Sequence, residues 1–495
     1  MGMSMKYRLS RRSLLRLSVA SAGAAALAAC GATPAPTTAP AAATVPAATT
    51  APGAAATAPA TEAAAAAATA TANPLSAVQI KTGKKVIEWW FGWGGMTSLN
   101  TFATLSKDFN DTHEDFQVKP LQVSDITQKL LAAIAGGNPP AVETGNIIFA
   151  EFWVRGAARQ LDDYIDKSTT IKMSDFFEDA VKAGQWKGKT YGLPAVEGYL
   201  RWGLCFNKAF LDKQGIKEDA LPNDFDSLYQ FAKDTTVIDA SGAIKTLGID
   251  PLDAMGGSFG DGDPFYWPAA FGLKYWDDAN SKYNFDNAQM ADAFAMVQKF
   301  YDIAGADKIQ GFTKSYGTWT ESPTAMFPTG VEAANINGYW APGELAKSAP
   351  DKHFVYTWVP TAQKGTKLQS TGGHYGMLPK GSPDPDLGWQ FIEYLNTDKA
   401  MQIIFDGTGW IGAHKAFADK LDVKKYEGLD FFVKSATEAT VMWRVYVDPV
   451  QAFVSDQWSK IQDSVNFHKV EPKEAAAQLQ KAADTELKNQ FPNGV

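Results

Sequence analysis

The order of apolar and polar positions in the first part of the folded region predicts alternating strands and helices. Residues 86–91 form a short, nearly continuous apolar run that stops at glycine, which indicates a buried strand. Apolar side chains then recur at helical spacing over residues 99–109 and 126–134, and residues 116–118 predict a second strand between them. We expect Ser124 to cap the second helix. This order is typical of a mainly parallel sheet covered by helices.

Helical spacing recurs in the rest of the chain. An apolar stripe over residues 290–300 follows Asp286 and Asn287, and helices are expected at residues 387–395, 400–405 and 472–487. The last of these helices has proline in its first turn, a favoured place.

The length and the cysteines refine this fold prediction. The chain has 495 residues with 45% hydrophobic content, which is too long for one compact domain, so we expect two lobes. Cys205 lies in a strand-like run and is expected to be a small buried hydrophobe.

The N-terminus has the pattern of an export signal. Basic residues, including the pair Arg11-Arg12, precede an apolar stretch over residues 14–29 that is shorter than the roughly 20 residues of a membrane-spanning helix. The stretch ends in Leu27-Ala28-Ala29-Cys30, which resembles a bacterial lipobox. We therefore predict a signal peptide over residues 1–29 and a lipid on Cys30. The twin arginines favour the twin-arginine export route, and the general secretory route stays open.

The segment after Cys30 predicts a tether. Residues 30–78 are rich in alanine, threonine and proline, and such a segment buries too little apolar surface to offset its ordering entropy. Without the five basic residues of the signal, 41 basic residues face 54 acidic ones, a net charge of −13. This acidity argues against nucleic acid as a partner.

Motifs for catalysis and metal binding are incomplete. Residues 256–260 match the string of a serine nucleophile elbow, but loop residues follow at 261–264 where a helix is required. Residues 184–190 have one residue too few between their glycines for a phosphate loop and are better interpreted as a hairpin. The five histidines show no metal-ligand spacing. The sequence predicts no catalytic residue, no metal and no cofactor.

The aromatic residues are the strongest compositional hint of function. Among fifteen tryptophans, Trp93, Trp267, Trp340 and Trp410 lie in loop-like contexts beside glycine or proline. A flat aromatic face can stack on the apolar face of a sugar, while carboxylates and amides hydrogen-bond its hydroxyls. Core packing is the alternative for each of these tryptophans.

Five short segments in order carry a resemblance to a known family. They are the strand at 86–91 ending in Gly-Trp-Gly, then residues 131–140, 188–194, 206–208 and 334–340. From about residue 80 onward the chain resembles the family 1 extracellular solute-binding proteins, the group that includes maltose-binding protein. The resemblance implies an α/β, periplasmic-binding-protein-like fold in which two α/β lobes are joined by crossing hinge segments, with ligand in the cleft.

The resemblance also implies where the lobes begin and end. Crossing segments are expected at residues 194–197, near 371–373 and near Tyr426. The implied lobes are residues 79–195 with 372–426, and residues 196–371 with 427–495.

Site residues follow from the same resemblance. Glu197 matches a family carboxylate that contacts sugar, and Trp340 matches a stacking tryptophan beside Gly338, which is expected to let the backbone approach the ligand. Residues 263–268 resemble an acidic, aromatic cleft loop. The chain departs from the family at Ala141, where the family has an aspartate after two prolines, and Glu143 and Asn146 are the candidates to replace the contact of that aspartate. The predicted ligand-binding set is Trp93, Glu143, Glu197, Asp263, Tyr266, Trp267, Trp340, Tyr375 and Trp410.

The implied function is that of a lipoprotein on the outer face of the cytoplasmic membrane. It captures a sugar or oligosaccharide and delivers it to the permease of an ABC importer, as a hinge-closing monomer and not as an enzyme. A polyamine or a polyol phosphate as ligand, a lipid-anchored carbohydrate-active enzyme, and a surface adhesion or sensing protein are the alternatives.

Overall fold

The computed structural model describes residues 73–146, 150–252, 266–317, 319–443 and 447–495. These described residues fold as one compact unit. The predicted signal peptide, Cys30, most of the predicted tether, the glycine-rich string at 256–260 and Asp263 lie outside the described residues.

The predicted alternation of strands and helices is confirmed in the first sheet. Strands β1 (Lys85–Phe91), β2 (Phe116–Gln122) and β3 (Val142–Asn146) are parallel, and helices α2 (Met96–Thr112) and α3 (Ile126–Ala135) connect them. The sheet continues through β14 (Leu368–Met377), which is antiparallel to β3, to β15 (Val441–Trp443). Its interior is aromatic, because Trp89 on β1 packs against Phe102 and Phe391.

A second sheet consists of β7 (Gly203–Asn207) between β12 (Ala334–Asn337) and β13 (Phe354–Thr357), all antiparallel. Cys205 lies in the central strand and is fully buried, as the sequence predicts.

The predicted helices are present, with one capping residue misassigned. The apolar stripe at 290–300 is the buried face of α10 (Ala288–Tyr301), whose cap Asn287 accepts the amide of Met290 at 2.9 Å. The prediction that Ser124 caps α3 is wrong. Asp125 precedes the helix in a left-handed conformation without a side-chain cap bond, and the Ser124 hydroxyl accepts from Lys129 instead.

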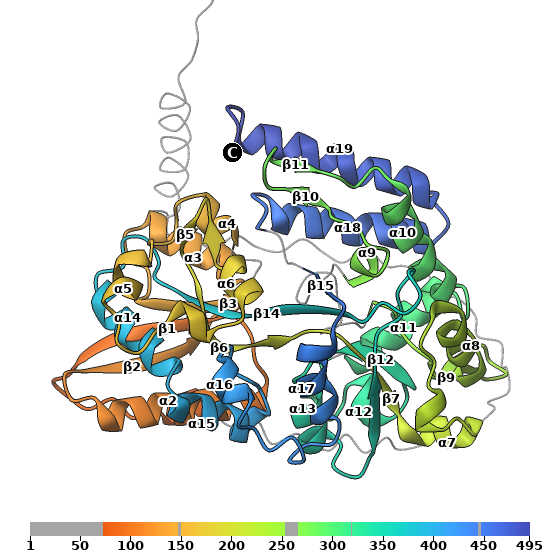
Figure 1. Cartoon of the computed structure of the whole chain (residues 1–495), viewed down its shortest axis with the longest axis horizontal. Helices are drawn as coiled ribbons and strands as arrows, with labels where there is room; N and C mark the ends of the chain where they lie inside the picture. The colour runs from red at the N-terminus through yellow and green to blue at the C-terminus, as the bar shows by residue number, and fades with distance from the viewer. Residues whose placement is uncertain (1–72, 147–149, 253–265, 318, 444–446) are drawn as a thin grey trace, which may run out of the picture. The chain divides into compact units, whose positions relative to one another are not determined.

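The remaining elements surround the two sheets (Figure 1). Short 3-10 turns lie at Pro74–Ala77, Met173–Asp175 and Glu218–Ala220. Three small hairpins are formed by β4 (Gln185–Trp186) with β5 (Lys189–Thr190), β8 (Val237–Ile238) with β9 (Ile244–Thr246), and β10 (Trp276–Asp277) with β11 (Lys282–Tyr283). The other helices are α4 (Ala150–Val154), α5 (Asp162–Lys167), α6 (Glu178–Ala183), α7 (Lys208–Gln214), α8 (Phe225–Thr235), α9 (Tyr266–Ala270), α11 (Ala306–Tyr316), α12 (Met326–Thr329), α13 (Ala341–Ser348), α14 (Pro385–Leu395), α15 (Asp398–Thr408), α16 (Lys415–Ala418), α17 (Leu429–Glu438), α18 (Gln451–Asn466) and α19 (Pro472–Gln490).

The strands that contain two of the predicted crossings, residues 194–197 and 371–373, pair with each other. Strand β6 (Leu193–Leu200) lies antiparallel to β14 and runs alongside it in Figure 1. Gly373 is opposite Gly198, and His374 is opposite Glu197, with a register shift just after His374. A Cβ atom on Gly373 would lie 2.3 Å from the carbonyl oxygen of Glu197, so only glycine fits there. The lobe boundaries given above remain predictions.

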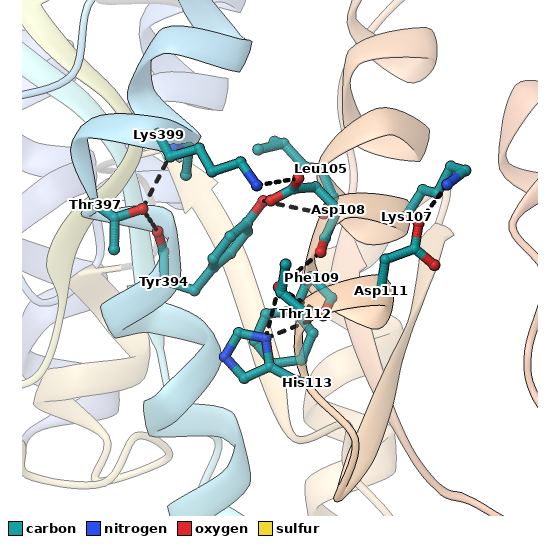
Figure 2. A network of polar contacts seen from close by, with 11 residues as sticks. Leu105, Lys107, Asp108, Phe109, Asp111, Thr112, His113, Tyr394, Thr397 and Lys399 are labelled. Carbon is teal, nitrogen blue, oxygen red and sulfur yellow. Dashed lines mark hydrogen bonds and ion pairs between the residues drawn. The ribbon is translucent and has the colours of Figure 1, made fainter.

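Helix α2 is fixed on α14 and α15 by the polar network of Figure 2. The Tyr394 hydroxyl donates to the Leu105 carbonyl at 3.3 Å and to the Asp108 carboxylate at 2.9 Å, and Lys399 lies 2.5 Å from the same carboxylate. Figure 2 also shows His113, which ends the helix and stacks on Phe109 at 3.8 Å. The C-terminal half of α2 therefore has a fixed position, and its first residues lie beside the site described next.

Candidate ligand-binding site

Three aromatic side chains from distant segments form what we call the aromatic stack: Trp93, His374 and Trp410. Trp93 follows β1, and its ring stacks on the His374 imidazole with a centroid distance of 3.5 Å. Trp410 follows α15 and lies 5.3 Å from Trp93 and 6.3 Å from His374. The Trp93 indole donates to the Thr144 carbonyl at 3.0 Å, which fixes the ring beside β3. The fold thus brings together two of the predicted tryptophans.

A buried carboxylate lies against the stack. Glu197 on β6 is only 3% exposed, and its Oε1 lies 2.6 Å from His374 Nδ1 and 3.7 Å from the Arg201 guanidinium. The Tyr339 hydroxyl donates to its other oxygen. Burial by itself would raise the pKa of Glu197, but the charge of Arg201 and the contacts with His374 and Tyr339 outweigh it and lower that pKa. Glu197 is therefore a charge-compensated carboxylate at neutral pH.

Trp340 packs against the arginine that compensates this carboxylate. Its indole is 7% exposed and is covered by the Arg201 guanidinium, 5.1 Å from the ring centroid. A Cβ atom on Gly338 would lie 2.1 Å from the Trp340 ring. The missing side chain of Gly338 therefore makes room for the Trp340 indole, and the approach of this backbone to a ligand stays a prediction.

A second buried carboxylate holds Trp410. Glu344 on α13 accepts the Trp410 indole N–H at 3.0 Å and the Thr320 hydroxyl. Burial, followed by repulsion from Glu321, raises the pKa of Glu344 to about 8. At neutral pH this carboxyl is therefore mostly protonated.

Several predicted site residues lie in the hydrophobic core. In α9, the Trp267 ring packs against Phe225 and Phe300 and its N–H donates to the Pro251 carbonyl at 2.7 Å. Tyr266 is also buried and donates to a backbone carbonyl, that of Pro360, at 2.8 Å. Both side chains are almost fully buried among core residues, so they are structural in this arrangement.

Tyr375 and Glu143 are also buried. The Tyr375 ring contacts Trp153 edge to face, and its hydroxyl donates to the Ala180 carbonyl at 2.7 Å. Glu143 lies inside β3, and neither carboxylate oxygen has a hydrogen-bond partner among the described residues. Burial raises the pKa of Glu143 well above its usual value. The structure joins neither residue to the aromatic stack.

Sequence reasoning missed four side chains that complete the site: Arg201, His374, Tyr339 and Glu344. The one local signal was Arg201, four residues after Glu197. Within the described ranges, no group of three or more histidine, cysteine, aspartate or glutamate side chains could hold a metal ion. A search of the same residues for a helix long and apolar enough to cross a membrane found none. Chemically, the site offers flat aromatic faces next to a compensated carboxylate and a guanidinium.

Solved structures with the same fold are periplasmic-type binding proteins. The mannotriose-bound CpMnBP1 has a TM-score of 0.73 at 23% identity, covering 81% of this chain and 100% of that chain. The maltotriose-bound maltose/maltodextrin-binding domain of Bdellovibrio bacteriovorus has a TM-score of 0.66 at 20% identity, with the same coverage. The GacH receptor of Streptomyces glaucescens has a TM-score of 0.64 at 19% identity, covering 83% of this chain and 100% of that chain. The predicted two-lobed α/β binding-protein fold is confirmed.

Sequence comparison gives the family. Among curated proteins no sequence matches the chain. The family model described as bacterial extracellular solute-binding protein matches residues 104–431, which span more than half of the sequence. The two-sheet fold and the polar, aromatic site agree with that match, and the chain belongs to the bacterial extracellular solute-binding proteins.

Proposed function

We propose that the protein binds a sugar or oligosaccharide at the aromatic stack and delivers it to the permease of an ABC importer. The observation that carries the proposal is the contact of Trp93 and Trp410 with a histidine that touches the Glu197 carboxylate. Indole faces suit the C–H face of a pyranose, and Glu197 and Arg201 suit its hydroxyls. The mannotriose and maltotriose in the similar structures support this ligand class.

The charges of the site favour a neutral ligand over a polyamine. Glu197 is compensated by Arg201, and Glu344 is mostly protonated at neutral pH because burial raises its pKa to about 8. A cationic ligand would need ionised carboxylates without such partners. The same Arg201 charge is already paired, which disfavours a polyol phosphate.

A thermal-shift screen of the full chain tests the ligand class. Ligand that binds only the folded state raises the melting temperature by mass action. We expect neutral oligosaccharides such as mannotriose or maltotriose to raise it, and spermidine and glycerol phosphate to leave it unchanged. A response to spermidine alone would overturn the sugar proposal. The recovered ligand should be chemically unchanged, whereas hydrolysis products would indicate an enzyme.

Trp93→Ala then tests whether the ligand binds at the aromatic stack. Loss of one stacking surface should weaken binding of the sugar found in the screen about ten- to a hundred-fold, by analogy with stacking of bases on aromatic side chains. Trp358→Ala is the matched control, because Trp358 is also partly buried and packs against Lys367 and Phe431. Equal affinities of the two variants would place the ligand elsewhere.

We also propose that Cys30 carries a lipid that holds the protein at the outer face of the cytoplasmic membrane. The proposal rests on the lipobox-like sequence and on the extracellular family. Cys30→Ser should release the protein from the membrane fraction or leave it unprocessed. Membrane association at the wild-type level would contradict the anchor.

A further inference from the structure

Glu321, between α11 and α12, binds the start of α2 although 223 residues separate it from Ser98. Its carboxylate accepts the Gly95 amide at 3.0 Å, the Ser98 amide at 2.7 Å and the Ser98 hydroxyl at 3.0 Å, and it is only 8% exposed. The capping residue of α2 is Gly95, which has no side chain to accept these donors. Glu321 therefore satisfies first-turn amides with a charged acceptor, where the helix dipole favours negative charge.

The glycines before α2 make this contact possible. A Cβ atom on Gly95 would lie 3.0 Å from the Glu321 carboxylate, and one on Gly94 would lie 2.8 Å from the Ser98 hydroxyl. Gly94 also has φ +107°, which few other residues adopt. The loop that carries Trp93 is thus shaped around the carboxylate of a distant residue.

The residue before Glu321 reaches the other tryptophan of the aromatic stack. Thr320 donates its hydroxyl to Glu344, and Glu344 accepts the Trp410 indole N–H at 3.0 Å. The Thr320 carbonyl in turn accepts the Ser348 hydroxyl from α13 at 2.6 Å. The neighbouring residues Thr320 and Glu321 therefore contact the surroundings of both tryptophans of the stack, because Gly95 is two residues after Trp93.

We propose that Glu321 is a positioning residue for the ligand site: it fixes the spacing of Trp93 and Trp410 by holding the start of α2 next to the Thr320–Glu344 contact. This inference rests on the proposed function, in which the two indoles bind the ligand. Without the Glu321 carboxylate, the Trp93 loop loses its tie to residues 320–321, and the ring spacing is no longer fixed.

Hydrogen–deuterium exchange of the ligand-free full chain tests the proposal. In Glu321→Ala we expect about ten-fold faster amide exchange over residues 92–98, as for the loss of a charge-assisted hydrogen bond, and faster exchange also over residues 408–412 around Trp410. Glu438→Ala is the control, because Glu438 makes an exposed ion pair with Lys367 and should leave both segments unchanged. Faster exchange confined to residues 92–98 would reduce Glu321 to a local helix cap and overturn the proposal.

Glu321→Gln covers the case in which the alanine variant does not fold. Glutamine keeps one carbonyl acceptor but lacks the charge, so both segments should exchange at rates between those of the wild type and the alanine variant. An effect of Gln on neither segment would also contradict the proposal.

A titration with mannotriose separates this inference from the proposed function. Glu321→Ala should bind mannotriose about ten-fold more weakly than wild type. Glu321→Gln should have an intermediate affinity, and Glu438→Ala should bind as tightly as wild type. Wild-type protein that binds no neutral oligosaccharide contradicts the proposed function, and the exchange pattern alone then decides the role of Glu321. Unchanged affinity in Glu321→Ala, with wild-type binding established, overturns the positioning role.

Discussion

Trp410 of the aromatic stack and Trp267 of α9 are similar in burial but differ in the hydrogen-bond partner of the indole. Trp410 and Trp267 are almost equally buried, at 3% and 2% exposed. The Trp267 indole donates to a backbone carbonyl, whereas the Trp410 indole donates to the carboxyl group of Glu344. Burial therefore does not distinguish Trp410, a proposed binding residue, from the core residue Trp267. Trp410 differs from Trp267 in its hydrogen-bond partner, because a side-chain carboxyl can change its protonation or its partner and a backbone carbonyl cannot.

The largest effect is expected for Trp267→Ala, which tests the core side of the comparison. Removing this ring should reduce the free energy of unfolding by about 3–5 kcal/mol, as for other large-to-small substitutions of buried aromatic residues. Urea unfolding measures the loss, and a titration of the remaining folded protein measures affinity. Affinity should be unchanged, and a clear loss of affinity in the folded fraction would place α9 in the ligand site.

Glu344→Gln tests the partner of Trp410 through pH. Because the folded-state pKa of Glu344 is about 8 and the ordinary value is 4.5, the folded protein binds the extra proton between these pH values. The contribution to stability is present below pH 4.5 and is lost as pH rises toward 8, with a slope of up to about 1.4 kcal/mol per pH unit. Glutamine keeps a carbonyl acceptor for the Trp410 indole and cannot ionise, so it should remove this slope.

Urea unfolding of Glu344→Gln and wild type at pH 5, 6, 7 and 8 checks this expectation. Glu438→Gln is the control, because its carboxylate is exposed next to Lys367 and has a lowered pKa. Parallel stability curves for wild type and Glu344→Gln would show that Glu344 is ionised in the folded protein.

The smallest effect is expected for a matched pair, Trp410→Phe and Trp267→Phe. Each change keeps an aromatic ring and removes one indole N–H, so each should cost about 1 kcal/mol of stability. Only Trp410→Phe should also weaken sugar binding, since its lost bond connects the stack to Glu344. Titration of both variants with the sugar and urea unfolding of both variants check this expectation. Equal losses of sugar affinity would show that the hydrogen bond of Trp410 with Glu344 has no special role in binding.

Local patterns predicted the fold well because strand and helix periodicity is a short-range property. The order β1, α2, β2, α3 and the buried stripe of α10 follow from it. The prediction that Ser124 caps α3 failed because the residue before the helix is Asp125, in a left-handed conformation. A local sequence pattern does not reveal that backbone conformation.

The site was predictable only in part. Trp93, Trp410 and Glu197 were identified from sequence, and the fold gathers them around His374, while their contact with a ligand stays a prediction. His374 was missed because its contact with Glu197 depends on the register of β14 on β6, which no local pattern encodes. Tyr266 belongs to the sequence 263–268, which resembles a cleft loop, and sequence does not reveal which aromatic side chains of such a segment face the core.

The paired strands β6 and β14 have a mechanical consequence. Hydrogen bonds between antiparallel strands run perpendicular to the strands, so the pair resists sliding of one strand along the other. Residues 371–373 of β14 pair with β6 and with no other described strand, and a two-stranded segment of this kind twists more readily than a wide sheet. The close approach of Gly373 to the Glu197 carbonyl adds to this resistance at mid-ribbon. If the crossing segments act as a hinge, we expect movement through this pair to be a twist about its length. His374 and Glu197 are paired across the two strands, so they should move less than groups farther from that axis.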